Sequence, residues 1–443
     1  MKSFYYLRLC FVCFLAFSCN ESKKSAEDID KQDDLEVEVF KTAKFLTLSD
    51  VHLDSSKTNV PYGSIHSTGR DIWERTINQI NTVSNTIQPK FMVYVGDVPN
   101  YTEDIHGNIS KVFKDLSALK GDYPILFLPG NNDTMNGDYN SFQNAPNPNG
   151  VSVFSLNNNT WPIINRNSTT TTVGTLDFNE EFGFYSVELT IDGERLQIIA
   201  LNSVIFSRKY TAYDGVTRDT AAQRQFSWFE NKLDSYATTD HVLVMMHIPP
   251  GRDGHGTYGA NMWDERLYVK NKNDKSKKVQ NAFLDVLKNN KPKLRGILTS
   301  HTHLDGLRRL YASDRYGGNM ITVSISTPGI SVYHNNNPGF KSFTFNSSNF
   351  DLTDFATYYA EPTDSLPTSS YKDRDFKYIS KPYSFKNTYK ITDEKMSIFS
   401  AIEQLKHRHI INGYMKDILY VRSKDTSAAG RFHYDHALDV LYQ

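Results

Sequence analysis

Cysteine is confined to one end of this sequence, and no thiol follows the first 19 residues. The three cysteines are Cys10, Cys13 and Cys19. The rest of the chain therefore cannot form disulfides, zinc–thiolate sites or a cysteine nucleophile. An excess of charge is also missing, because 49 Lys and Arg face 50 Asp and Glu, for a formal net charge of -1. Without a basic field we expect no binding to nucleic-acid duplexes.

Long hydrophobic runs are missing as well, and the one apolar stretch suited to a membrane lies at the N-terminus. Residues 9–17 are apolar and follow Lys2 and Arg8, but a membrane-spanning helix needs roughly 20 such residues. This arrangement is typical of a signal peptide. Residues 15–19 resemble a bacterial lipobox, in which the final cysteine, here Cys19, carries the lipid. An ordinary cleaved signal or a buried apolar segment are the alternatives.

We therefore predict a signal peptide at residues 1–18 and a polar, lipidated tether at residues 19–43. The protein would be exported and held at the bacterial outer membrane or cell surface by its lipid anchor. A periplasmic or secreted protein is the alternative.

Strand and helix patterns alternate after the tether, which favours a layered α/β fold whose sheets are covered by helices. Apolar stretches predict strands at residues 44–49, 91–95, 124–128, 182–189, 196–201, 241–246, 295–299, 320–326 and 340–345. Amphipathic spacing predicts helices at residues 71–86, 109–119, 221–236 and 279–288.

Two segments depart from this alternation. Residues 144–175 are rich in Asn, Pro and Thr and predict a long surface loop. The pattern becomes helical towards the end, with helices predicted at residues 392–407, 413–421 and 433–441. We therefore predict a catalytic domain at residues 44–360 and a small helical extension at residues 361–443. The side chains of Arg308 and Arg309 are interpreted as lying on a solvent-exposed surface.

Polar residues follow five of the predicted strands, at the point where each strand ends. In chain order they are Asp50 and His52, Asp97, Asn131, His247, and His301 with His303. Ligands of open α/β sheets bind outside the carboxyl ends of the strands, so we expect these side chains to converge.

Carboxylate and imidazole without thiolate suit Zn, Mn or Fe. Seven such ligands are too many for one tetrahedral ion, and they suit two ions that share a carboxylate. Any single Asp-X-His or His-X-His pair is weak support, since a core histidine is more often just hydrogen-bonded. The pairs His407/His409 and His433/His436 have similar spacing, but they lie in charged helical surroundings and are interpreted as solvated.

These residues resemble the calcineurin-like metallophosphoesterase superfamily, and more narrowly its acid sphingomyelinase-like phosphodiesterases. The narrower resemblance is carried by the following segments: Asp50-Val51-His52-Leu53-Asp54, Gly96-Asp97-Val98-Pro99, Ala200-Leu201-Asn202, His247-Ile248-Pro249-Pro250-Gly251, Thr327-Pro328 and Asn337-Pro338-Gly339-Phe340. The resemblance covers residues 44–359. It implies a sandwich of two central β-sheets flanked by helices, with a small C-terminal helical subdomain.

The resemblance also implies a ligand set. One metal would be held by Asp50, His52 and His303, and the other by Asn131, His247 and His301. Asp97 would bridge the two ions, which in this family are usually zinc. A hydroxide held between the ions would then attack the phosphorus atom of a phosphodiester.

The sequence departs from that family at two proton-donating histidines. The family motif Gly-Asn-His has Asn132 in its third place, and a second family histidine is replaced by Tyr101. Loss of a general acid typically costs about 10²–10⁴-fold in rate. Tyr101, His106 and His255 are candidates for a replacement donor by their positions in loops. The alternative is a substrate whose leaving group needs less protonation.

Three functions remain open on the sequence. The first is a di-metal phosphodiesterase acting on a sphingomyelin-like lipid or a nucleotide derivative. The second is a hydrolase of polyphosphate or nucleotide anhydrides, because the motif Gly-Asn-Asn-Asp also resembles that of endopolyphosphatases. The third is a surface lipoprotein that binds a phosphorylated ligand without hydrolysing it.

Overall fold

The structure is a computed structural model of the chain. It describes residues 40–59, 67–100, 104–134, 137–141, 162–166, 168–212, 215–254, 260–314, 318–363, 375–411, 418–424 and 437–443. None of the helices in these ranges is long and apolar enough to cross a membrane. The predicted signal peptide and nearly all of the predicted tether lie outside them.

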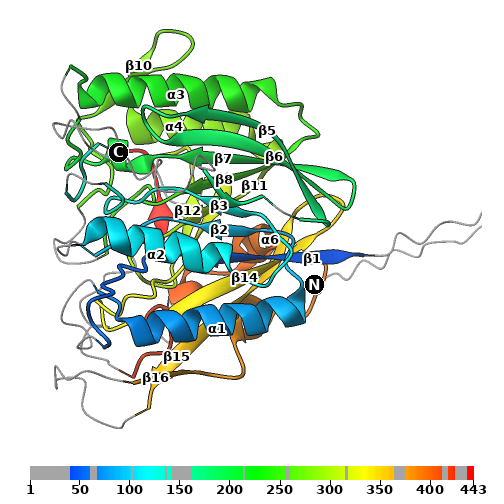
Figure 1. Cartoon of the computed structure of the whole chain (residues 1–443). Helices are drawn as coiled ribbons and strands as arrows, with labels where there is room; N and C mark the ends of the chain where they lie inside the picture. Colours follow the sequence, from blue (N-terminus) through cyan, green and yellow to red (C-terminus); the bar gives the residue numbers. More distant parts are fainter. Residues whose placement is uncertain are drawn as a thin grey trace, which may run out of the picture. The chain divides into compact units, whose positions relative to one another are not determined.

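The first sheet contains the strands nearest the start of the chain (Figure 1). Its order is β16-β15-β14-β1-β2-β3-β4, and β17 pairs with β15. The strands are β1 (Thr42–Leu48), β2 (Met92–Tyr94), β3 (Ile125–Phe127), β4 (Ile163–Asn165), β14 (Gly339–Asn346), β15 (Leu352–Pro362), β16 (Phe376–Tyr378) and β17 (Tyr383–Ser384). Because β1, β2 and β3 are parallel, their carboxyl ends lie at one edge.

The second sheet has the order β18-β12-β13-β11-β8-β7-β6-β5. Its strands are β5 (Thr171–Asn179), β6 (Phe184–Ile191), β7 (Glu194–Leu201), β8 (His241–Met246), β11 (Leu294–Thr299), β12 (Leu307–Leu310), β13 (Thr322–Ser326) and β18 (Asp439–Val440). β7, β8, β11 and β13 are mutually parallel neighbours. A separate hairpin joins β9 (Tyr268–Lys270) to β10 (Ser276–Lys278).

Helices cover the sheets (Figure 1). α1 (Arg70–Ile87) and α2 (Ile105–Ser117) lie against the first sheet, and α3 (Arg218–Ser235) and α4 (Val279–Asn289) lie beside the second. α1 buries an apolar stripe that includes Ile72, Trp73 and Ile80, while the Trp73 indole donates to Asp115 Oδ2 of α2 at 2.7 Å. The shorter helices are η2 (Ser203–Phe206), η3 (Lys291–Lys293), α5 (Phe385–Tyr389), α6 (Ile398–Gln404) and α7 (His407–His409).

The predicted sandwich of two sheets flanked by helices is confirmed, but three local predictions are wrong. Within the predicted loop of residues 144–175, strand β4 and the start of β5 pair into the two sheets, because the β-branched threonines before residue 173 suit a strand. Within the helix predicted at residues 433–441, Asp439–Val440 is strand β18, which pairs with β12.

The third error concerns Arg308, which is buried rather than solvated. Its guanidinium donates to the backbone oxygens of Pro250, Arg252 and Ala437, at 3.2, 2.9 and 3.1 Å. Arg309 pairs with Asp439 of β18, with Nε 2.6 Å from Oδ1. Both arginines therefore bind the C-terminal segment that contains β18 to the second sheet. The sequence does not show this, because β12 is too short for an alternation of apolar and polar residues to identify Arg308 as buried.

A buried ion pair joins the first sheet to the loop that follows β11. Lys341 Nζ of β14 lies 2.5 Å from Asp305 Oδ1, and both side chains are almost fully buried. Asp305 Oδ2 accepts from Thr357 Oγ1 and from the Tyr383 hydroxyl, both at 2.7 Å. Asp305 lies two residues beyond His303, so this network anchors the His301–His303 loop to β14, β15 and β17.

We predict that Lys341→Met destabilises the protein by about 3–5 kcal/mol, because the Asp305 carboxylate would stay buried without its counterion. Urea unfolding of the purified variant measures this, with the exposed Lys377→Met of β16 as the control. The double variant Lys341→Met/Asp305→Leu should recover part of the loss. A single variant as stable as the control would contradict the assigned role of the pair.

Candidate metal centre

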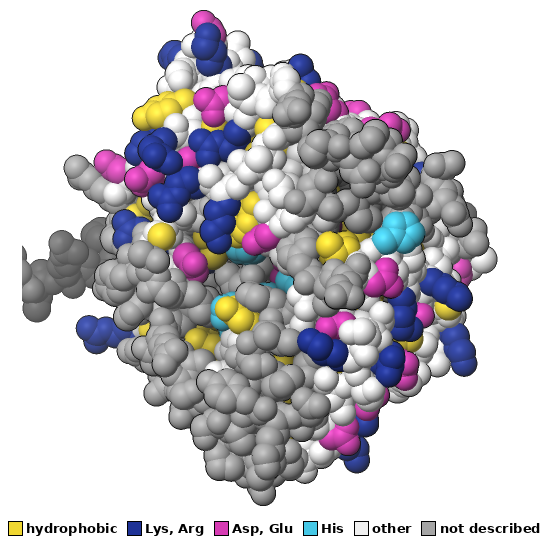
Figure 2. Space-filling view, turned by 60° about the vertical axis from the view of Figure 1, so that its left-hand side comes forward, with side chains coloured by type: hydrophobic (Ala, Val, Ile, Leu, Met, Phe, Trp, Pro, Cys, Tyr) yellow, Lys and Arg dark blue, Asp and Glu magenta, His cyan; other side chains and the backbone are white. Residues whose placement is uncertain are grey.

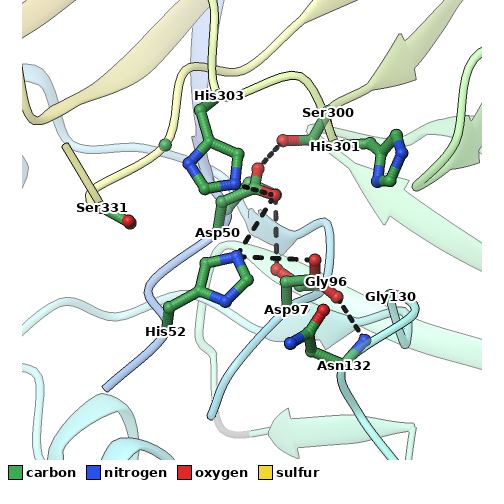
Figure 3. Close-up of polar contacts among 12 residues, drawn as sticks. Asp50, His52, Gly96, Asp97, Gly130, Asn132, Ser300, His301, His303 and Ser331 are labelled. Atoms are coloured by element: carbon green, nitrogen blue, oxygen red, sulfur yellow. Dashed lines mark hydrogen bonds and ion pairs between the residues drawn. The ribbon is translucent and has the colours of Figure 1, made fainter. Parts of the chain in front are cut away.

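The candidate ligands come from the carboxyl ends of strands in both sheets. Asp50 and His52 follow β1, Asp97 follows β2, and Asn131 follows β3. His247 follows β8, and His301 and His303 follow β11. The predicted convergence is seen in the structure. His52 and His303 lie beside Asp50 (Figure 3), and His247 Nε2 is 4.0 Å from Asp50 Oδ1.

Most of the candidate ligands have an unusual backbone conformation. Left-handed φ values occur at Asp50 (46°), His52 (47°), Asp97 (60°), His301 (71°) and His303 (59°). Such values are uncommon outside glycine and cluster at functional sites, where the surrounding structure fixes them. The strands thus end in tight turns that aim successive side chains at one place.

Two glycines allow the loops after β2 and β3 to approach each other. A Cβ at Gly96 would lie 2.4 Å from the Gly130 nitrogen, and a Cβ at Gly130 would lie 2.2 Å from Asp97 Oδ1. Gly96 also has a φ of 94°, which a residue with a side chain rarely adopts. The glycines of Gly96-Asp97 and Gly130-Asn131 are therefore required by close packing around the Asp97 carboxylate.

The ligands form two groups, each able to hold a metal ion. Asp50, His52 and His303 make one group, and Asp97, His247 and His301 make the other, with the ligand atoms of each group within 4.8 Å of one another. Asn131 joins the second group, since its Oδ1 lies 3.1 Å from His247 Nε2. This division matches the one that the family resemblance implies.

Asp97 lies between the two groups. Its Oδ2 is 3.1 Å from His247 Nε2 and 3.5 Å from His52 Nε2. Its Oδ1 accepts a hydrogen bond from the Asn132 backbone nitrogen at 2.7 Å (Figure 3). Asp97 is thus the carboxylate placed to be shared by two ions.

The donor set fits two divalent metal ions. Asp50 Oδ1 is fully buried yet accepts no hydrogen bond from a described residue. It lies 3.6 Å from His303 Nε2 and 3.9 Å from His52 Nε2. A buried oxygen without a hydrogen-bond donor, surrounded by imidazole nitrogens, fits a metal ion whose ligand distances are about 2.0–2.2 Å.

The pKa values of the ligands depend on their burial and on the charges around them. Burial alone would lower the pKa of His247, but Asp97 and Asp50 raise it to about 9. Burial and the neighbouring His247 lower the pKa of His301 to about 3. Burial opposes ionisation of Asp50, yet His303 and His52 keep its pKa low. The two carboxylates therefore favour the charged form of His247, whereas burial and His247 favour the neutral form of His301.

Hydrogen bonds outside the ligand set orient the ligands. His247 Nδ1 lies 2.7 Å from the Val95 carbonyl oxygen, and an N–H there leaves Nε2 free to face the second group. The Ser300 hydroxyl donates to Asp50 Oδ2 (Figure 3).

Asp133 is a structural residue of the site that the sequence did not single out. Its carboxylate accepts from the backbone nitrogens of Asp97 and Val98, at 2.7 Å each, and of Gly130, at 2.6 Å. Burial and the nearby Asp97 raise the pKa of Asp133 to about 7. Asp133 is the fourth residue of the segment Gly130-Asn131-Asn132-Asp133, and its place in this motif is the feature of the sequence that could have identified it.

A cavity of about 380 Å³ opens above these ligands. Figure 2 shows histidine side chains at the bottom of a hollow, with hydrophobic and acidic side chains at its edge. Besides the ligands, the cavity is lined by Asn132 and by these residues: Asn100, Asp138, Tyr139, Lys209, Asp253, Met262, Thr302, Tyr333 and His334.

The four residues predicted to donate a proton or stabilise the transition state differ in where the structure places them. Asn132 lines the cavity, and its Oδ1 accepts from Asn131 Nδ2 at 2.6 Å. His106 is exposed on α2 and does not line the cavity. Tyr101 and His255 lie outside the described residues. Of the four, the structure therefore brings Asn132 to the ligands and leaves His106 away from the cavity.

Comparisons with known proteins agree with this geometry. The sequence model described as calcineurin-like phosphoesterase matches residues 43–305. The cyclic GMP-AMP phosphodiesterase SMPDL3A of Bos taurus is 25% identical over 296 residues, covering 62% of this chain and 57% of that protein. Sphingomyelinase phosphodiesterase D of Dictyostelium discoideum is 25% identical over 324 residues, covering 70% of this chain and 65% of that protein.

The matches span about three fifths of the length of these two relatives. A solved dimetal phosphatase from Danio rerio matches with a TM-score of 0.43 and 14% identity, covering 72% of this chain and 95% of that one. The resemblance to the acid sphingomyelinase-like group is confirmed by the curated relatives.

We predict that Asp50→Ala lowers the bound divalent metal from about two ions per chain to about one, because Asp50 belongs to one group of ligands only. Elemental analysis of dialysed protein measures the content. The control is Asp274→Ala, whose carboxylate is exposed and pairs with Lys270. A variant that keeps both ions would remove Asp50 from the ligand set.

Proposed function

Because the chain belongs to the calcineurin-like phosphoesterase family, we propose that its cavity hydrolyses phosphodiesters with the help of two divalent ions. The observation that carries the proposal is the position of Asp97 between two groups of ligands at the base of the cavity. Two-metal sites of this kind clamp the attacking and the leaving oxygens of a phosphate ester.

The position of each candidate ligand indicates which of the two ions it would hold. Asp50, His52 and His303 would hold one ion, Asn131, His247 and His301 the other, and Asp97 both. When bound, the ions polarise the phosphoryl oxygens and lower the pKa of water towards ~7. Zinc is the metal we propose, with manganese or iron as alternatives, since carboxylate and imidazole suit all three.

The relatives suggest the substrate. One is named for cyclic GMP-AMP and another for sphingomyelin, and both are phosphodiesterases by name. We propose a phosphodiester of one of these kinds, a nucleotide derivative or a sphingomyelin-like lipid. The polar ligands at the base of the cavity would take the phosphate, and the rim residues Tyr139, Met262 and Tyr333 would contact the rest of the molecule.

A second candidate is the hydrolysis of a phosphoanhydride, and Asn132 favours it. The Asn132 amide cannot supply a proton, and it is already bonded to Asn131. A phosphate leaving group needs less protonation than an alcohol. If diesters are cleaved while polyphosphate chains keep their length, this candidate is eliminated. A third candidate, a protein that binds a phosphorylated ligand without turnover, would release no product even from activated esters.

We also propose that the chain is exported and attached to a membrane by a lipid at Cys19. The support is the apolar stretch at residues 9–17 followed by a single late cysteine. In bacteria that express the full sequence, a palmitate analogue should label the protein, and Cys19→Ala should remove the label. Label that persists in that variant would contradict the anchor.

We predict that metal-supplemented residues 20–443 hydrolyse bis-p-nitrophenyl phosphate and that Asp97→Asn abolishes this turnover. The reason is that Asp97 is the carboxylate common to both ligand groups. The exposed variant Asp274→Asn serves as the control. Undiminished turnover in Asp97→Asn would refute the proposed mechanism.

We predict that Asn132→His raises kcat/KM for alkyl phosphodiesters at least about 10-fold more than for nitrophenyl diesters, because an imidazole there can protonate a poor leaving group. Steady-state kinetics on the two substrate classes measure the ratio. Asn273→His, on the exposed turn between β9 and β10, is the matched control. An equal change on both classes would show that position 132 does not face the leaving group.

A further inference from the structure

One basic side chain, Lys209, lines the cavity beside the candidate ligands. Lys209 is the only Lys or Arg among the described residues that line it. Its side chain is exposed and its charge acts on the nearby Asp138, but no salt bridge joins its ammonium to a carboxylate of a described residue. Asp138, which also lines the cavity, accepts instead from Asn131 Nδ2 at 2.7 Å.

The Lys209 ammonium is held close to the candidate ligands by an aromatic ring. Lys209 Nζ lies 4.8 Å from the centre of the Tyr139 ring, within the range of a cation–π interaction. The Tyr139 hydroxyl oxygen lies 3.3 Å from His301 Nε2. Tyr139 itself is buried, so its ring forms a fixed support between the cation and the ligand group.

The backbone around Lys209 is fixed as well. The Lys209 nitrogen donates to Ser207 Oγ at 3.2 Å, within a turn that follows η2. The Thr211 nitrogen donates to the Tyr139 oxygen at 3.0 Å, and the Tyr139 nitrogen donates to the Asn131 oxygen at 3.0 Å. A chain of hydrogen bonds therefore sets the position of Lys209 relative to the proposed ligand Asn131.

We propose that Lys209 is a specificity-determining residue, which binds a second anionic group carried by the departing part of the substrate. This inference rests on the proposed hydrolysis of phosphate esters and names the preferred substrates: those whose leaving group is itself a phosphate or bears one. Such groups leave as anions, and a cation stabilises them where the family's imidazole donors are absent.

The chemistry balances without a further reactant. The oxygen of water forms a bond to phosphorus, and the bond from phosphorus to the leaving oxygen breaks. The leaving oxygen keeps the electron pair of that bond and a negative charge, which the Lys209 ammonium attracts. The protons of water pass to the product phosphate or to solvent. No proton has to be delivered to the leaving oxygen before it departs.

The test compares two substrates in the metal-loaded protein. Adenosine diphosphate has a phosphate as its leaving group, whereas bis-p-nitrophenyl phosphate releases p-nitrophenolate, which carries no second anionic group. We expect Lys209→Met to lower kcat/KM for adenosine diphosphate about 10–100-fold more than for bis-p-nitrophenyl phosphate, as for the loss of a hydrogen bond to a charged group. Lys209→Arg should retain most of the preference, and Lys114→Met on α2 is the control.

A second readout does not depend on turnover. Calorimetric binding of inorganic pyrophosphate to the metal-loaded protein should weaken about 10-fold or more in Lys209→Met, while binding of orthophosphate changes much less. Equal losses for both substrates and both anions would overturn the inference, as would no loss for either. If the unsubstituted protein cleaves neither substrate, the proposed function fails, and the pyrophosphate measurement still decides the role of Lys209.

Discussion

The shared carboxylate of Asp97 is the interaction on which the rest of the site depends. One oxygen faces His247 and His52 from opposite ligand groups, and the other accepts from the Asn132 backbone. A buried carboxylate is costly unless cations and hydrogen bonds surround it. The arrangement of both strand-end loops, the two glycines and the three hydrogen bonds to Asp133 all serve to place this one charge.

The two sheets keep the ligand loops in conformations that the loops would not adopt alone. Asp50 and His52 both have left-handed backbone conformations. Their backbone N–H groups donate to the carbonyl oxygens of Gly96 and Asp97, at 2.9 and 3.2 Å. In the second sheet the Ser300 nitrogen donates to the His247 oxygen at 3.0 Å. Because each loop is hydrogen-bonded to the next one along its sheet, the surrounding structure fixes each ligand in its uncommon conformation.

The sequence predicts the strands that precede the ligands, and the ligands themselves, because both depend on local patterns, whereas it misses β12 and β15. Apolar stretches that end in Asp, His or Asn are visible one strand at a time, and parallel pairing then brings their ends together. The rim of the cavity has no such pattern, since Tyr139, Lys209, Met262 and His334 come from unrelated loops. Likewise nothing local marks Lys341 or Arg308 as buried, because their partners lie far away in the chain.

During hydrolysis the leaving oxygen gains negative charge, which must be neutralised by a proton or a cation. Asn132 stands where the family motif has a proton-donating histidine, so this site must stabilise the charge in another way. The Asn132 amide is bonded to Asn131, so its contribution is to hold a proposed ligand rather than to deliver a proton. A cavity built in this way favours either a leaving group that is stable as an anion or a cation that stabilises one. Lys209, which the Tyr139 ring holds beside the ligands, offers the second of these, and the two solutions reinforce each other for a substrate that leaves as phosphate. The proposed preference for phosphate leaving groups thus follows from Asn132, which stands where the family motif has a histidine.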